Sequence, residues 1–155
     1  MFDAKHMAVC SSRIIPAHAK DIFDLLAMPA LHSKIDGSGT VRGVLNGPER
    51  LYLSAKFGMR MKMVVPYRMT NTVIEFEENK LIAWRHFGGH IWRYRLSEID
   101  TQDGQPSTEV MECFDYSTAR SVRFIQLIDA PVRNLISIEK TLLRLEQVFS
   151  EGLPT

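Results

Sequence analysis

Three side chains in this sequence have chemistry suited to proton transfer: His86, Tyr94 and Glu112. All three occupy even positions of segments that alternate in the manner of β-strands, so we expect them to share the covered face of a sheet. His86 and Glu112 are predicted on strands that could be near neighbours. A buried carboxyl group beside an imidazole can act as a general acid or base, as an aldol-type cyclase or dehydratase requires. The alternative is a structural role, because a buried glutamate is costly unless another group hydrogen-bonds it.

Residues 80–98 are the most informative stretch, and they predict a β-hairpin that turns at Gly88 and Gly89. One set of alternating positions is bulky and largely aromatic, and the other set carries cations. The first set is Ile82, Trp84, His86, His90, Trp92, Tyr94 and Leu96, and the second includes Arg85, Arg93 and Arg95. This alternation predicts a sheet with one covered and one solvated face. Because the covered side chains have polar tips, they favour a lined cavity over a close-packed core.

A further set of residues is predicted to line this cavity and bind its ligand. Its aromatic members come from the strands, its methionines supply a flexible and polarisable wall, and its last three members come from the C-terminal helix. The set is Phe57, Met59, Met61, Phe76, Trp84, Trp92, Phe114, Tyr116, Leu135, Ile138 and Leu142. The alternative is that these side chains simply fill a core.

The elements that must position these residues follow from the hydrophobic periodicity. Strands are expected over 7–15, 40–46, 50–57 with a continuation to 63, 67–77, the two arms of the hairpin and 107–117. Short helices are expected over 17–27 and 29–34. A partly helical segment over 119–128 precedes a long helix that starts at Asp129-Ala130-Pro131. The apolar stripe of that helix is the only large one available, so the sheet must wrap around it.

The arginines of the hairpin have a structural explanation on the preceding strand. In that strand Asn71, Val73, Glu75 and Glu77 alternate on one side, which we expect to be the outer one. Glu75 and Glu77 would then face the arginines, and opposite charges across strands help to set the register.

Composition limits the class of protein. A chain of 155 residues is expected to be one domain over 1–155, and 45% hydrophobic with 24% charged residues is ordinary for a globular protein. A net charge of +1 argues against a nucleic-acid binder. No run is long enough to insert into a membrane, and the N-terminus lacks the layout of a secretory signal, so a cytoplasmic location is expected.

The cysteines and loops point away from cofactors. Cys10 and Cys113 lie in strand-like patterns and are expected to be buried and reduced, because disulfides are rare in the cytosol. No cluster of cysteine and histidine has metal-ligand spacing, and no glycine-rich loop has the context of a phosphate site. We therefore expect no metal and no cofactor.

The order of elements and several short motifs resemble the SRPBCC or START-related helix-grip superfamily, in particular its bacterial polyketide cyclase/dehydrase-like branch. The motifs are residues 36–40 (DGSGT), 47–51 (GPERL), 82–90 (IAWRHFGGH), 92–94 (WRY) and 114–117 (FDYS), and the resemblance runs from about Met7 to Glu151. It implies an α+β fold in which a seven-stranded curved antiparallel sheet wraps around a long C-terminal helix, with two short helices after the first strand. It also implies a cavity that takes an apolar small molecule, and it places the first and last strands side by side, which could bring the two thiols close.

Three functions are compatible with these features. The first is binding or carriage of an apolar or aromatic small molecule, such as a lipid, a polyketide or an aromatic metabolite. The second is a cofactor-free polyketide cyclase or dehydratase that uses His86, Glu112 and Tyr94. The third is a non-catalytic homodimeric interaction module, with exposed apolar residues in 57–63 or 122–128 as its patch.

Overall fold

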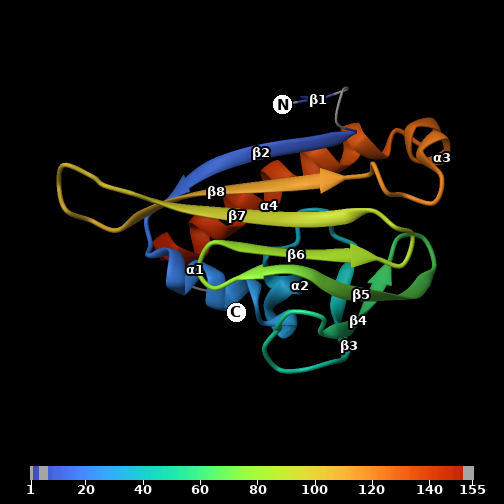
Figure 1. Cartoon of the computed structure of the whole chain (residues 1–155), viewed down its shortest axis with the longest axis horizontal. Helices are drawn as coiled ribbons and strands as arrows, with labels where there is room; N and C mark the ends of the chain where they lie inside the picture. The colour runs from blue at the N-terminus through green and yellow to red at the C-terminus, as the bar shows by residue number, and fades with distance from the viewer. Residues whose placement is uncertain (1, 4–6, 152–155) are drawn as a thin grey trace.

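The computed structural model describes residues 2–3 and 7–151, and its strands form one curved antiparallel sheet. The strands are β1 (Phe2–Asp3), β2 (Ala8–Ile15), β3 (Val41–Asn46), β4 (Lys56–Lys62), β5 (Pro66–Glu77), β6 (Leu81–His86), β7 (Ile91–Ile99) and β8 (Ser107–Asp115). Their order across the sheet is β1-β2-β8-β7-β6-β5-β4-β3 (Figure 1). The predicted α+β helix-grip fold with seven strands is therefore confirmed, and the two-residue β1 extends the sheet at its edge beside β2.

The helices cover the concave face of the sheet. They are α1 (Ala19–Leu26), η1 (Pro29–Leu31), α2 (His32–Ile35), α3 (Val122–Leu127) and α4 (Ala130–Glu151). The sheet wraps around helix α4, as predicted, and the helix lies against β2 and β8, while the short helices after β2 cover the half of the face nearer β3 (Figure 1). Among the described residues, no helix is long and apolar enough to cross a membrane.

The apolar stripe of α4 forms the core with the sheet. Ile138, Leu142 and Leu145 are at most 1% exposed. Burying a side chain of this size contributes roughly 1.5–3 kcal/mol, so the stripe is enough to hold the helix in the curve of the sheet. The helical segment before α4 is separated from it at Asp129, whose φ of 54° is left-handed and lies between the end of α3 and the start of α4.

The strand expected over residues 50–57 is wrong for most of its length. Residues 50–55 form a loop, and β4 begins only at Lys56. Leu51 and Ala55 are nevertheless 1% exposed, because the loop folds back and the Leu51 amide donates to the carbonyl of Ala27 (2.7 Å). Alternating apolar residues can thus be buried by a loop as well as by a strand.

A β-bulge in β5 changes which residues face the core. Val73 pairs with Trp84 and Glu75 pairs with Ala83, so Ile74 is an extra residue between them. Asn71 and Val73 are buried, contrary to the expected outer placement, while Glu75 does lie on the outer face. A bulge exchanges the inner and outer faces of the strand for all residues beyond it. A sequence pattern with a strict period of two does not reveal this exchange.

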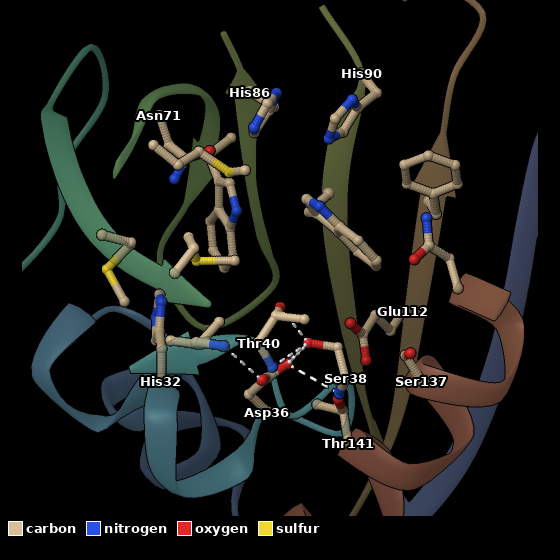
Figure 2. Close-up of a pocket in the computed structure, with 18 of the residues that line it drawn as sticks. His32, Asp36, Ser38, Thr40, Asn71, His86, His90, Glu112, Ser137 and Thr141 are labelled. Carbon is tan, nitrogen blue, oxygen red and sulfur yellow. Dashed lines mark hydrogen bonds between the residues drawn. The ribbon is translucent and has the colours of Figure 1, made fainter. Parts of the chain in front are cut away.

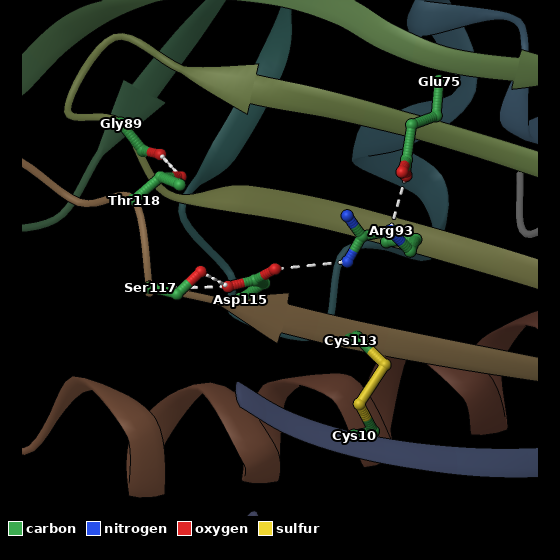
Figure 3. A network of polar contacts seen from close by, with 8 residues as sticks. All are labelled: Cys10, Glu75, Gly89, Arg93, Cys113, Asp115, Ser117 and Thr118. Carbon is green, nitrogen blue, oxygen red and sulfur yellow. Dashed lines mark hydrogen bonds and ion pairs between the residues drawn. A yellow bond between two sulfur atoms is a disulfide. The ribbon is translucent and has the colours of Figure 1, made fainter. Parts of the chain in front are cut away.

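The outer face carries an ion-pair network beside a disulfide (Figure 3). The guanidinium of Arg93 bonds Glu75 on one side (2.5 Å) and Asp115 on the other (3.3 Å). Burial lowers the pKa of Arg93, but its two carboxylate partners outweigh burial and the net shift of the pKa is upward. Cys10 and Cys113 are opposite each other in the register of β2 and β8 and are bonded, with Cα atoms 4.1 Å apart. The expectation of reduced cysteines is therefore wrong, because the pairing of the two strands places the thiols directly opposite each other.

Candidate functional site

A cavity of about 430 Å³ lies between the concave face of the sheet, the corner after α2 and the first half of α4. This volume falls within the range of small-molecule pockets. The cavity is far from filling the concave face, because the second half of α4 packs closely against the sheet. The predicted site residues can therefore be divided into those that line this cavity and those that do not.

The structure places six of the predicted ligand-binding residues and all three predicted acid-base residues on the pocket wall. These are Phe57, Met59, Met61, Trp84, Trp92 and Phe114, together with His86, Tyr94 and Glu112. Trp84 pairs with Trp92, which pairs with Phe114, so three aromatic rings form one row across β6, β7 and β8. The wall is thus aromatic where the alternation predicted it.

The other five predicted ligand-binding residues do not line the pocket. Ile138 and Leu142 lie within the core beneath the sheet, with at most 1% exposure, and Leu135 packs against that core. Phe76 contacts Phe23 edge-on (5.3 Å between ring centroids). Tyr116, which is 1% exposed, stacks on Phe114 (5.7 Å). Alternation identifies the inward face, but it does not separate residues that border empty space from residues that fill a core.

The carboxyl group of Glu112 is buried, and one of its two oxygens has a hydrogen-bond partner. It is 3% exposed, and its Oε1 accepts a hydrogen bond from the Tyr94 hydroxyl (2.7 Å), while its Oε2 is among the buried polar atoms without a partner in the described part of the chain. Burial raises the pKa of Glu112 to about 8, the bond from Tyr94 opposes this shift and the charge of Asp36 adds to it. Burial, followed by the nearby Glu112, also raises the pKa of Tyr94. At neutral pH this pair is a neutral acid beside a neutral phenol.

His86 lies at the turn of the hairpin and is stacked on His90, with ring centroids 4.1 Å apart and planes inclined by 13°. Its Nδ1 accepts the amide proton of Gly88 (2.8 Å), so the neutral ring carries its proton on Nε2. Burial lowers the pKa of His86 to about 4, and burial together with the neighbouring His86 lowers that of His90 to about 3. Both imidazoles are therefore neutral at physiological pH.

His86 and Glu112 face the same pocket but lie at different ends of it. Figure 2 shows the two imidazoles near Asn71 at one end and Glu112 near Ser137 and Thr141 at the other. Strand β7 separates β6 from β8, and Tyr94, the register partner of Glu112, pairs with Ile82 rather than with His86. Ile82 precedes His86 by four residues, about 13 Å along a strand. The two strands are near neighbours with one strand between them, but the two side chains lie too far apart for direct contact.

The corner after α2 forms one side of the pocket. Asp36 accepts the backbone amides of Ser38 (3.1 Å) and Val41 (3.0 Å), as expected of a turn residue, and its Oδ1 also accepts the Ser38 hydroxyl (2.7 Å) (Figure 2). Gly37 approaches α4 closely, because a Cβ atom there would lie 2.3 Å from the carbonyl oxygen of Ser137. Its amide donates to the Thr141 hydroxyl (2.9 Å), which joins the corner to the helix.

His32 is a pocket residue with a structural partner. Its ring stacks on Trp84 (5.1 Å), and its Nε2 donates to the carbonyl of Leu26 (2.8 Å). Burial lowers the pKa of His32, so the ring stays neutral. The ring nitrogen that could have hydrogen-bonded a ligand is thus bonded to the last carbonyl group of α1.

Several polar wall residues were not predicted as site residues. They are His32, Asp36, Ser38, Thr40, Asn71, His90, Arg133, Asn134, Ser137 and Thr141. His90 has the same even-numbered position in the alternation as Trp92, so its inward orientation was predictable from the sequence. Ser137 and Thr141 are four residues apart and therefore lie on one face of α4, a spacing that marks a small polar stripe beside the apolar one. Asn71 was hidden by the bulge.

Comparison with known proteins identifies first the fold and then the family. No family model matches the chain. The crystal structure of protein Ms6760 from Mycobacterium smegmatis has a TM-score of 0.71 at 12% identity, over 97% of this chain and 95% of that one. The solution structure of the Polyketide_cyc-like protein Cgl2372 from Corynebacterium glutamicum has a TM-score of 0.64 at 16% identity, over 96% and 94%. These likenesses show that the chain has the same helix-grip fold as the two structures.

A curated relative defines the family more narrowly. The uncharacterized protein Rv0088 of Mycobacterium tuberculosis is 34% identical over 155 residues, which cover 97% of this chain and 67% of the relative. The chain belongs to the same family as this mycobacterial protein.

Proposed function

We propose that the protein binds and carries an apolar or aromatic small molecule in the pocket beneath β4–β8. The observation that carries this proposal is an empty volume of about 430 Å³ walled by tryptophan, phenylalanine and methionine side chains. Ligand pockets are typically apolar with a few placed polar groups, and this wall has that composition. Elements from α1 to α4 contribute to the wall, which supports a single working domain over 1–155.

A matched pair of methionine substitutions tests this proposal. Met61 lines the pocket, whereas Met111 lies on the outer face of β8 and is 37% exposed. M61W should fill the pocket and weaken the binding of a solvatochromic naphthalene dye about tenfold or more, because the ligand would lose its contacts with the wall. M111W should leave dye binding unchanged. Equal dye binding by M61W and the parent protein, measured by fluorescence titration, would contradict a guest in this pocket.

Native mass spectrometry gives an independent test. Protein purified from its own host should retain a small apolar molecule that is displaced by the dye. M61W purified in the same way serves as the control, since it should carry less of that molecule. Persistent absence of any such adduct from the parent protein would argue against a carrier.

One observation favours the enzymatic alternative, a cofactor-free polyketide cyclase or dehydratase. Glu112 is a neutral acid with a free oxygen facing the pocket, beside Tyr94. Such a group can donate a proton to a carbonyl oxygen of a bound ketone and so favour enolisation. The separation of His86 from Glu112 favours separate roles at the two ends over a single relay. E112Q would abolish turnover of a polyketide substrate and retain its binding if this alternative holds.

The homodimer alternative now rests on α3 and on the tip of the β4–β5 hairpin. Phe57 and Met59 are at most 3% exposed, so most of the patch expected over 57–63 faces inward. Leu127 is 82% exposed and Val64 is 91% exposed. Light scattering of the parent protein and of L127S measures the association directly, and a monomeric parent would eliminate this alternative.

The bond between the two cysteines bears on the expected cytoplasmic location. Because disulfides are rare in cytosolic proteins, the Cys10–Cys113 bond weighs against that location. Alkylation of freshly lysed host cells followed by mass spectrometry distinguishes the cases. Two free thiols would support a cytoplasmic protein, and a bonded pair would support an oxidising compartment.

A further inference from the structure

Two buried polar atoms in the pocket wall have no protein partner. In the described part of the chain, the buried unpartnered side-chain atoms are His86 Nε2, Glu112 Oε2 and Asn79 Oδ1, and the first two belong to residues that line the pocket. His86 is 9% exposed and Glu112 is 3% exposed. Buried polar groups are almost always hydrogen-bonded, because an unpaired one loses its hydration without compensation. Two such atoms on one pocket wall need hydrogen-bond partners that the described part of the chain does not supply.

At the hairpin end, the missing partner must be an acceptor. The amide of Gly88 donates to His86 Nδ1 (2.8 Å), which fixes the neutral tautomer with its proton on Nε2. Stacking on His90 at 4.1 Å holds the ring in place. His86 therefore presents a fixed N–H donor.

At the helix end, the missing partner is again an acceptor. The Tyr94 hydroxyl donates to Glu112 Oε1 (2.7 Å), which leaves Oε2 as the oxygen available for the carboxyl proton. Burial favours the protonated form, and the charge of Asp36 favours it further. Glu112 therefore presents an O–H donor at neutral pH.

The two donors are separated by the length of the aromatic wall. The backbone positions differ by four residues along the strands, about 13 Å, and by two strands across the sheet. The row formed by Trp84, Trp92 and Phe114 lies between them in the register. The wall between the polar ends is thus built for an apolar body.

We propose that this pocket recognises an elongated, uncharged, largely apolar molecule with a hydrogen-bond-accepting oxygen at each end, one bound by His86 Nε2 and the other by Glu112 Oε2. Carbonyl oxygens of a ketone, ester or quinone meet this description. An anionic end group would find no cation among the buried groups of the wall, because Arg133, the one arginine or lysine on the described wall, is exposed on α4. The inference rests on the proposed function, since it names the class of ligand for the same pocket.

A series of linear ketones tests the inference. The series consists of a diketone with about thirteen bonds between its carbonyl groups, the matching monoketone, the matching alkane and the matching terminal diamine. That length matches a separation of about 16 Å, which combines about 13 Å along the strands with two strand spacings of about 4.8 Å across the sheet. Affinities are measured by displacement of the naphthalene dye. Since one buried hydrogen bond is worth about tenfold in affinity, the diketone should bind about tenfold more tightly than the monoketone and about a hundredfold more tightly than the alkane.

Four variants separate hydrogen bonding from packing. H86F keeps an aromatic ring but removes the donor, and E112L removes the donor at the other end, so each should weaken the diketone about tenfold and leave the alkane unchanged. E112Q keeps a neutral donor and should bind the diketone as the parent does. E109Q, on the same strand but exposed, is the matched control and should change nothing.

The outcomes distinguish this inference from the proposed function. If the dye binds but the ketones and the alkane compete equally, or if H86F and E112L weaken every ligand alike, the recognition of two oxygens is overturned while a general apolar pocket remains. If the diamine binds most tightly, Glu112 is an ionised partner and the inference is also overturned. If neither the dye nor any chain binds, both the inference and the proposed function fail.

Discussion

The two ends of the concave face are built by the same strands and the same helix, yet one is filled and the other is open. At the filled end, Leu96, Val110 and Leu145 belong to the core and are at most 5% exposed. At the open end, the corresponding positions of β6–β8 hold His86, Trp92 and Glu112. Branched aliphatic side chains interdigitate closely, whereas flat rings and polar tips leave gaps unless a guest completes them.

The same contrast runs along α4. The apolar stripe continues through the helix, but near its first half Ser137 and Thr141 replace larger side chains at the pocket wall. Short polar residues leave room above the helix without exposing its backbone. The open end is thus a consequence of side-chain size and chemistry and does not require a different backbone.

The largest expected effect tests the filled end. L145A should lower the free energy of unfolding by about 3 kcal/mol, because it removes a fully buried side chain and leaves a cavity. M61A, at the open end, should cost about 1 kcal/mol or less, because that side chain already borders empty space. Urea denaturation measures both. Equal losses would show that the two ends are packed alike.

Removal of the disulfide, which lies on the outer face behind the open end, tests how much this covalent link contributes to stability. C10S should lower the free energy of unfolding by about 2–4 kcal/mol relative to the oxidised parent, since the bond closes a long loop. Reduction of the parent protein should have the same effect, and C10S should not respond to the reductant. Unchanged melting on reduction would show that the thiols are not bonded in solution.

The pH dependence of stability sharpens the comparison, because it arises at the open end. The pKa of Glu112 rises from its ordinary value of 4.5 to about 8 in the folded chain. Between these values the unfolded chain has lost the proton that the native protein keeps, so Glu112 lowers stability by about 1.4 kcal/mol per pH unit as the pH rises, up to about pH 8. Below about pH 6.5 the buried His86 and His90 act in the opposite direction, because their pKa values are lowered in the folded chain, so the net decline is expected between about pH 6.5 and pH 8. Tyr94 and Asp36 are the ionisable groups acting on it.

E112Q removes this titration. Its free energy of unfolding, measured by urea denaturation from about pH 6.5 to about pH 9, should lose the decline seen in the parent. L145A at the filled end should keep the decline, because it leaves Glu112 in place. A parent protein whose stability does not fall over this interval would mean that Glu112 is hydrated or ionised in the native state.

The smallest expected effect is a spectroscopic one. Nitrogen NMR at neutral pH should show His86 as the tautomer protonated on Nε2, because Gly88 occupies Nδ1. Binding of the diketone should shift the Nε2 resonance and leave the tautomer unchanged. A charged His86 at neutral pH would contradict the burial that lowers its pKa.

The fold was predictable because its periodicities are strong and local. The two arms of the hairpin and the stripe of α4 alternate without interruption, and only a sheet wrapped around a helix buries both. The inward parity of His86, Tyr94 and Glu112 was predictable for the same reason, and the structure brings all three to one pocket.

The remaining features depend on information that a local pattern does not contain. The extra residue at Ile74 reverses the faces of β5, so the burial of Asn71 was missed. The order of strands places β7 between β6 and β8, which separates His86 from Glu112. The register of β2 on β8 decides that Cys10 and Cys113 are opposite each other. Each of these is a relation between distant segments.

Gly37 gives the size of the pocket an unusual origin. Since even a methyl group at this position would collide with the carbonyl of Ser137, the corner can lie this close to α4 only with a glycine here. A larger residue here would push the helix outward and enlarge the chamber, so adding atoms to the protein at this point would make room for a bulkier guest.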